Sequence, residues 1–103
     1  MDLILSGGLN VYPAEVEAVL TRVDSITEVA VVGLPDERWG HVVTAYYVGH
    51  AEEEDILETC REYLAAYKIP RKMFKVDALF HTSSGKISRK MVRDAVADGK
   101  LPS

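Results

Sequence analysis

One stretch decides the fold of this 103-residue chain, and it reads Ile26-Thr-Glu-Val-Ala-Val-Val-Gly-Leu-Pro-Asp-Glu-Arg-Trp-Gly-His-Val-Val-Thr-Ala-Tyr-Tyr-Val-Gly49. Residues 26–34 and 41–48 within it are rich in β-branched and aromatic side chains, which favour β-strands. Pro35-Asp36 lies between these two halves, and this dipeptide is typical of a turn. The stretch therefore predicts two strands separated by a turn, with Gly49 closing the second strand.

Helical patterns flank these strands on both sides. Val16, Val19 and Leu20 follow Pro13 at helical spacing, and proline is tolerated in a first helical turn. Apolar residues at helical spacing predict three helices in all, and these are residues 13–23, residues 52–67 and the segment that follows a Ser88 cap. With further strands expected at residues 2–5 and 71–76, the order of elements predicts an α+β fold. We expect a small sandwich of short β-sheets with about three helices, in a single domain over residues 1–103.

Composition excludes several classes of protein. No apolar run reaches the roughly 18 residues that a membrane span needs, and the N-terminus lacks the pattern of a signal peptide. Cys60, the only cysteine, excludes an internal disulfide framework and favours a reducing compartment, so we expect a cytoplasmic protein. The three histidines are widely spaced, and no catalytic triad can be assembled from spacing, so a self-contained hydrolase or metalloenzyme has little support.

Charge is divided unevenly along the chain. Residues 1–67 hold 3 basic and 13 acidic side chains, whereas residues 68–103 hold 9 basic and 3 acidic ones. Most of the basic side chains fall in one segment, and these are Lys68, Arg71, Lys72, Lys75, Lys86, Arg89, Lys90 and Arg93. Such a patch attracts phosphates, although it is also what an ordinary solvated face looks like. Nucleic acid is not expected as a partner, because the acidic half would repel a long polyanion.

A lysine follows glycine in the polar loop Thr82-Ser83-Ser84-Gly85-Lys86. The loop has half of a Walker-type phosphate-binding pattern, but Phe80 and Ile87 stand where that pattern needs Gly and Ser or Thr. What remains is a compact cation on a glycine-preceded loop, which can reach a phosphate held by another domain. The alternative is an ordinary exposed lysine.

Two further features can serve either binding or structure. The glycines of the loop Ser6-Gly7-Gly8-Leu9-Asn10 would let a ligand approach closely, or they would simply form a tight turn. Trp39 lies in a polar turn, where an indole can offer a stacking face to a ligand or act as a lid on the core. Neither choice can be made from these residues alone.

Taken together, three ordered blocks resemble the C-terminal domain of the adenylate-forming superfamily, which includes acyl-CoA synthetases, peptide-synthetase adenylation domains and luciferases. The blocks are residues 2–17, residues 29–40, and the pair Tyr67-Lys-Ile-Pro-Arg71 and Thr82-Ser-Ser-Gly-Lys-Ile87. The resemblance implies an enzyme with a large N-terminal domain that binds ATP, Mg²⁺ and a carboxylic acid. In that family the acid first attacks the α-phosphate to give an acyl-adenylate, and a thiol such as that of CoA then attacks the adenylate. The small C-terminal domain rotates between two poses, one for each step.

The resemblance assigns roles to residues of this chain. Lys86 is similar to the lysine that assists adenylation, and Thr82, Ser83, Ser84 and Gly85 would support its loop. Ser6, Gly7 and Gly8 would line the tunnel for the pantetheine thiol. The residues that would lie near the CoA nucleotide are Trp39, Tyr67, Lys68, Arg71 and Lys72. The implied protein is an ATP-dependent acyl-CoA synthetase for fatty or aromatic acids, and this chain on its own would be inactive.

Two departures and two alternatives accompany this interpretation. Leu79-Phe80-His81 stands where the family usually has Leu-Pro followed by Arg or Lys, so the entry to the lysine loop is expected to be less rigid. The family's hinge residue would fall at or before position 1, so we expect the chain to begin at the hinge. The alternatives are a peptide-synthetase adenylation domain that loads a carrier protein and a stand-alone module that binds a partner without catalysis.

Overall fold

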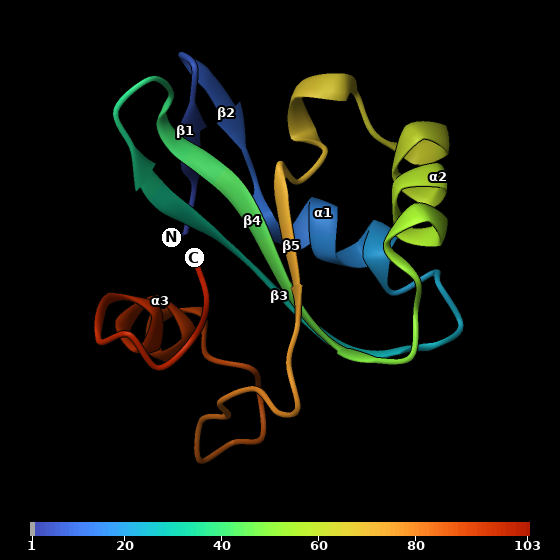
Figure 1. Cartoon of the computed structure of the whole chain (residues 1–103), viewed down its shortest axis with the longest axis vertical. Helices are drawn as coiled ribbons and strands as arrows, with labels where there is room; N and C mark the ends of the chain where they lie inside the picture. The colour runs from blue at the N-terminus through green and yellow to red at the C-terminus, as the bar shows by residue number, and fades with distance from the viewer. Residues whose placement is uncertain (1) are drawn as a thin grey trace.

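The computed structural model describes residues 2–103, which form a sheet covered by helices on both faces (Figure 1). Within these residues the elements follow one another as β1 (Ile4–Ser6), β2 (Leu9–Val11), α1 (Pro13–Leu20), β3 (Ile26–Asp36), β4 (Gly40–Gly49), α2 (Glu53–Tyr63), the 3₁₀ turn η1 (Ala66–Lys68), β5 (Lys72–Lys75) and α3 (Arg89–Ala97). No helix in the described part of the chain is long and apolar enough to cross a membrane.

The antiparallel pair β3 and β4 has the longest pairing in the sheet, with β4 inside the sheet and β3 at its edge. Their pairing runs from Ile26 opposite Gly49 to Asp36 opposite Gly40. Consecutive residues of β3 are buried on opposite faces, with Val29 and Val31 in one hydrophobic cluster and Ala30 in the other. Because both faces are covered, the strand is a continuous apolar run instead of an alternation of apolar and polar residues.

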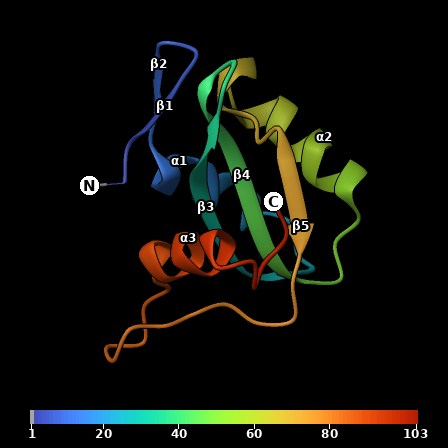
Figure 2. The same cartoon turned by 60° about the vertical axis from the view of Figure 1, so that its left-hand side comes forward.

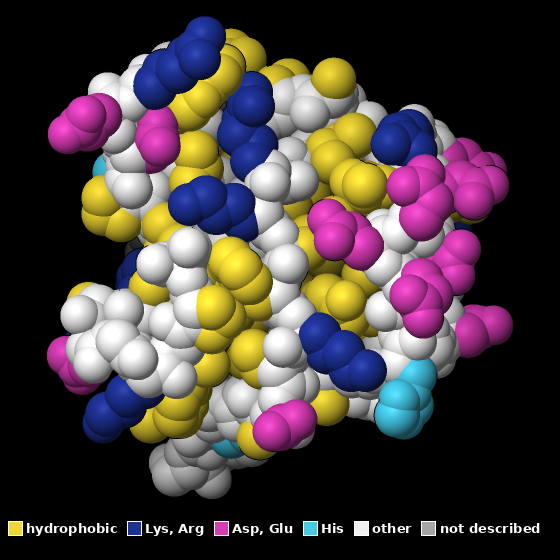
Figure 3. All heavy atoms as spheres, viewed as in Figure 1, with side chains coloured by type: hydrophobic (Ala, Val, Ile, Leu, Met, Phe, Trp, Pro, Cys, Tyr) yellow, Lys and Arg dark blue, Asp and Glu magenta, His cyan; other side chains and the backbone are white. Residues whose placement is uncertain are grey.

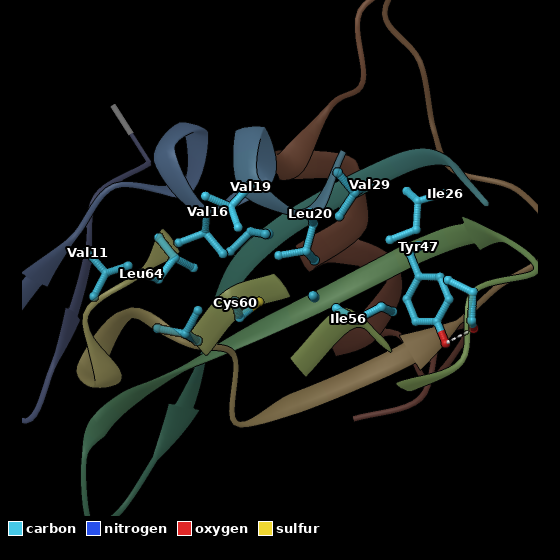
Figure 4. Packing of buried hydrophobic residues seen from close by; sticks show 14 of the residues in the cluster. Val11, Val16, Val19, Leu20, Ile26, Val29, Tyr47, Ile56, Cys60 and Leu64 are labelled. Atoms are coloured by element: carbon cyan, nitrogen blue, oxygen red, sulfur yellow. Dashed lines mark hydrogen bonds between the residues drawn. The ribbon is translucent and has the colours of Figure 1, made fainter. Parts of the chain in front are cut away.

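One face of the sheet is covered by α1 and α2. Val16 and Leu20 of α1 and Ile56 and Cys60 of α2 are buried in the first cluster (Figure 4). The hydroxyl of Tyr47 reaches out of this cluster and donates to the Ala51 carbonyl at 3.3 Å, so the one polar atom of that side chain is satisfied. This cluster gives the domain its larger core.

The opposite face is covered by α3 (Figure 2). Val92 of α3 is buried against a second cluster that includes Val32 and Tyr46, and the Tyr46 ring stacks on Phe74 with centroids 5.4 Å apart. The N-cap of α3 is Ser88, whose Oγ accepts from the Met91 amide as predicted. The domain therefore has three layers, which are α1 with α2, the sheet, and α3, and a hydrophobic cluster lies on each face of the sheet.

The edge of β4 that does not face β3 is shared by two short elements. Ser6 of β1 pairs with Gly40 at one end of β4, and β5 runs parallel to residues 44–47 further along. β2 completes the sheet beyond β1, in the order β2-β1-β4-β3. The β1–β2 turn and β5, whose neighbouring segments carry predicted CoA-binding residues, therefore lie along the same side of β4.

The α+β class and the prediction of about three helices are confirmed, while some boundaries differ. The strands form a single sheet, and β3 continues through Pro35 and Asp36, which were expected to form the turn. Proline lacks a backbone N–H, and β3 lies at the edge of the sheet, where this group is not needed for pairing. The turn instead occupies residues 37–39, and Gly40 follows it at a φ of +79°.

Two predicted helices are shorter than expected. The helix expected over residues 52–67 ends at Tyr63, because Leu64 is extended at a φ of −123° and a ψ of 143°. Tyr67, expected on the apolar face of that helix, is instead 43% exposed in η1. The first helix ends at Leu20, and the expected strand over residues 2–5 occupies Ile4–Ser6. Strand β2 was not predicted, because its three residues follow directly on a glycine turn.

Candidate functional site

The glycine loop is a tight two-residue turn between β1 and β2. Ser6 pairs with Leu9, and the intervening Gly7 and Gly8 have φ values of +57° and +82°. Two positive φ angles define the hairpin turn that glycine favours most. A Cβ placed on Gly8 would have no described atom within 4 Å, so this residue faces open space. The sequence thus needs both glycines for the turn, and Gly8 also leaves a free surface.

Gly7 packs directly on Trp39. The Gly7 amide donates to the Trp39 carbonyl at 2.8 Å, and a Cβ on Gly7 would lie 2.9 Å from Cε3 of the indole. The Trp39 turn is itself held by the Asp36 carboxylate, which accepts from the amides of Arg38 and Trp39 at 2.9 and 2.8 Å. Trp39 therefore joins the β1–β2 turn to the β3–β4 turn.

The indole of Trp39 is half-buried and carries Arg71 on its ring. The Arg71 guanidinium carbon lies 3.9 Å from the ring centroid, and the Arg38 guanidinium carbon lies 5.6 Å away. Trp39 also packs against the second hydrophobic cluster. Trp39 therefore covers part of the second cluster and carries the guanidinium of Arg71 on its ring, and stacking of the indole on a ligand stays a prediction.

Tyr67 and Lys68 lie on η1 near the same end of the sheet (Figure 1). The Tyr67 ring is exposed, and the Lys68 ammonium lies 5.6 Å from its centroid. Lys68 Nζ also donates to both carboxylate oxygens of Glu15, at 2.9 and 3.0 Å, and this hydrogen bond raises the pKa of Lys68. Lys72 is exposed at the start of β5. A phosphate at this end would meet Arg71 and Lys72 directly but would compete with Glu15 for Lys68.

The lysine loop is a hydrogen-bonded turn between β5 and α3. His81 forms an isolated antiparallel bridge with Ile87, the Thr82 amide donates to the Lys86 carbonyl at 2.7 Å, and the Gly85 amide donates to the Thr82 carbonyl at 2.9 Å. Gly85 has a φ of +87°, which explains the glycine before the lysine.

The hydroxyls of this turn are partly paired with each other. The hydroxyls of Thr82 and Ser84 lie 2.9 Å apart, and Ser83 is exposed with them. The turn that carries Lys86 is thus held by hydrogen bonds, and the less rigid entry expected from Phe80 and His81 stays a prediction.

Lys86 is exposed beside an open groove of about 530 Å³. The charged and titratable side chains that share this groove with Lys86 are Glu17, Glu28, His81 and Arg89. Even so, no carboxylate oxygen of residues 2–103 lies within 4.0 Å of Lys86 Nζ. An unpaired ammonium on a fixed turn is able to bind an anion from outside the domain.

The basic segment is not one patch. Four of its eight cations are neutralised by carboxylates, and these are Lys68, Arg89, Lys90 and Arg93. In the space-filling view, acidic side chains gather over α2 on one side, while Lys and Arg side chains are scattered elsewhere (Figure 3). Most of these carboxylates come from the first half of the chain, since only Asp94, the partner of Lys90, belongs to the basic half, and binding of a phosphate by the remaining cations stays a prediction.

A salt-bridge network attaches α3 to the start of the chain. Arg89 donates through Nε to Glu17 at 2.8 Å and through Nη1 to Asp2 at 3.1 Å, and its Nη2 also contacts Glu17. Arg93 donates to the other oxygen of Asp2 at 3.0 Å. Burial raises the pKa of Asp2, but the hydrogen bonds from Arg89 and Arg93 outweigh it and the net shift is downward. Sequence analysis missed this network, because its partners are separated by 72 to 91 residues.

The predicted site residues form two groups at opposite ends of the molecule. The β1–β2 turn and η1 lie at one end in Figures 1 and 2, and the loop between β5 and α3 lies at the other. Trp39 and Arg71 belong to the first group through their contacts, and Lys86 belongs to the second. In residues 2–103 there is no group of side chains that could hold a metal ion.

Comparison with known proteins agrees with this geometry. The family described as AMP-binding enzyme C-terminal domain matches residues 15–86, and the chain belongs to this family. The long-chain-fatty-acid–CoA ligase FadD13 of Mycobacterium tuberculosis is 44% identical over 96 residues, which cover 90% of this chain and 19% of that protein. The chain spans about one fifth of the length of the curated relatives it matches.

Solved structures show the same domain. A fatty acyl CoA synthetase of Mycobacterium tuberculosis is 42% identical and superposes with a TM-score of 0.90, over 95% of this chain and 20% of that one. The o-succinylbenzoate CoA synthetase MenE of Bacillus subtilis, in complex with the acyl-adenylate intermediate OSB-AMP, is 45% identical with a TM-score of 0.84. That match covers 91% of this chain and 20% of that one.

Proposed function

We propose that residues 1–103 are the C-terminal domain of an ATP-dependent acyl-CoA synthetase that acts on fatty or aromatic acids. The observation that carries this proposal is the exposed, unpaired Lys86 on a hydrogen-bonded turn, in a chain whose relatives are named as CoA ligases. ATP, Mg²⁺ and the acid would be bound mainly by an N-terminal domain, which is the partner of this one.

In the first step, the domain would present its Lys86 end to the N-terminal domain. The carboxylate of the acid attacks the α-phosphorus of ATP, an O–P bond forms, and the bond to pyrophosphate breaks. Negative charge on the phosphate oxygens is stabilised by a positioned cation. Lys86 would supply that cation, and the Thr82–Gly85 turn would fix the point from which its side chain extends.

In the second step, the domain would present its opposite end. The pantetheine thiol attacks the acyl carbonyl carbon of the adenylate, a C–S bond forms, and AMP leaves with the bonding electrons. Gly7 and Gly8, next to the buried Ser6, would leave room for the pantetheine arm, since Gly8 faces open space. Trp39, Tyr67, Lys68, Arg71 and Lys72 would contact the CoA nucleotide. The separation of these residues from Lys86 supports the use of two poses (Figures 1 and 2).

The proposal is tested with the full-length protein that contains this chain. We expect acid-dependent exchange of pyrophosphate into ATP, and formation of a thioester when free CoA is added. A panel of fatty and aromatic acids would identify the substrate. Exchange that proceeds while the acyl group passes only to a carrier protein would favour a peptide-synthetase adenylation domain. An absence of exchange with every acid would favour a non-catalytic module.

A further inference from the structure

Two carboxylates share the groove with Lys86, yet neither is paired with it. Glu17 accepts from Arg89 and from the Val31 amide, which lies 2.9 Å from its Oε2. Glu28 is engaged by Nε2 of His81 at hydrogen-bond distance. Each acidic neighbour of Lys86 is therefore already occupied by another donor.

His81 occupies the Glu28 carboxylate, which would otherwise be free to form an ion pair with Lys86. Its backbone bridge with Ile87 places His81 across the turn from Lys86, on the loop that carries the lysine. Glu28 lies on β3, and its contact with His81 connects two residues that are 53 positions apart. The side chains of His81 and Glu28 are 38% and 32% exposed, so the pair can rearrange without disturbing the core.

Loss of the imidazole would leave the Glu28 carboxylate without its partner in the groove that it shares with Lys86. An unpaired carboxylate attracts a nearby ammonium, and the flexible lysine stem can turn to meet it. Glu17 offers no comparable alternative, because Arg89 holds both of its oxygens. The captured lysine would have to break this contact before it could bind a phosphate.

We propose that His81 and Glu28 are positioning residues for Lys86, in which His81 occupies the Glu28 carboxylate and keeps the Lys86 ammonium free for the α-phosphate. This inference rests on the proposed function for the role of the phosphate, but the state of Lys86 can be measured without it. His81 stands where the family pattern has Arg or Lys, and each of these side chains can donate to a carboxylate. His81→Arg is therefore the conservative variant.

The first test measures the accessibility of Lys86 in the 103-residue chain. Acetic anhydride is added in trace amounts, and acetylation of Lys86 and of the exposed Lys100 is compared by peptide mass spectrometry. We expect His81→Ala to slow acetylation of Lys86 about two- to five-fold, the range of an exposed ion pair. His81→Ala/Glu28→Gln should restore the rate, and His81→Arg should leave it unchanged. The inference fails if His81→Ala has no effect, or if the double variant remains as slow as the single one.

The second test measures adenylation in the full-length protein. His81→Ala is expected to slow acyl-adenylate formation about two- to five-fold and to spare thioester formation from preformed adenylate. The double variant His81→Ala/Glu28→Gln should form the acyl-adenylate at the normal rate. His50→Ala, which changes an exposed histidine away from the groove, is the matched control. Simple loss of structure would not be rescued by a second substitution. If Lys86→Ala has full adenylation activity, the proposed function itself fails. If Lys86→Ala is slow but His81→Ala is as active as the unchanged protein, this inference alone fails.

Discussion

The network around Arg89 allows a quantitative prediction for stability. Arg89→Ala removes contacts with Glu17 and Asp2 and leaves the Glu17 carboxylate, whose side chain is 18% exposed, without its cation. Breaking a buried ion pair costs about 3–5 kcal/mol. Since the Arg89 side chain is 26% exposed, solvent reduces this effect, and we expect a loss of about 2–3 kcal/mol in the free energy of unfolding.

Lys90→Ala is the matched control on the same helix. Lys90 pairs with Asp94 at 2.8 Å, but the two side chains are 77% and 58% exposed, so its loss should cost below about 0.5 kcal/mol. Both variants of the 103-residue chain can be unfolded in urea and followed by Trp39 fluorescence. With a slope of about 1–2 kcal/mol per molar urea, Arg89→Ala should lower the midpoint by roughly 1–3 M. Equal midpoints for the two variants would refute the argument.

Two further predictions concern the glycine turn and the buried ionisable groups. Gly8→Leu in the full-length protein should block thioester formation and spare adenylation. The control is Gly99→Leu, which places leucine at a similar φ of +75° in open space and should spare both steps. Equal activity of the two variants in acyl transfer would remove Gly8 from the tunnel. Burial raises the pKa of Cys60 to about 11 and that of Tyr46 to about 12, both above their ordinary values of 9.0 and 10.0. Deprotonation therefore favours the unfolded chain, so the contribution of these two groups to the free energy of unfolding in urea should be constant below about pH 9 and fall as the pH rises towards 12. A Cys60→Ala variant with the same fall between pH 9 and 11 would contradict the assignment to Cys60.

The residue types and their spacing predicted most helices and strands of this fold, because helix and strand formation depends largely on neighbouring residues. The β-branched run over residues 26–34 and the helical spacing around Val16 and Ile56 depend on near neighbours and on burial. Cys60 lies on that spacing in α2 and is fully buried. Element ends were less predictable, since the extended Leu64 and the edge position of Pro35 are set by the rest of the sheet.

The candidate site was predicted through its motifs but not through its contacts. The glycine turn and the Gly85-Lys86 turn have local signatures in the sequence, namely glycines at positive φ. Arg71 on Trp39, Glu15 on Lys68 and Arg89 on Glu17 each join segments far apart in the chain. The sequence contains no local sign of such pairs, so it did not show which cations of the basic segment are paired with carboxylates.

The most direct test of this account separates the two half-reactions of the full-length protein. Lys86→Ala should slow acyl-adenylate formation about a hundred- to a thousand-fold, the typical cost of losing one positioned charge in a transition state. It should leave thioester formation from preformed acyl-adenylate largely intact, because the loop between β5 and α3, which carries Lys86, and the β1–β2 turn lie at opposite ends of the domain (Figure 1). Lys75→Ala, at an exposed lysine on β5, should affect neither step. An equal loss in both half-reactions, or no loss in adenylation, would contradict the assignment of Lys86 to the first step.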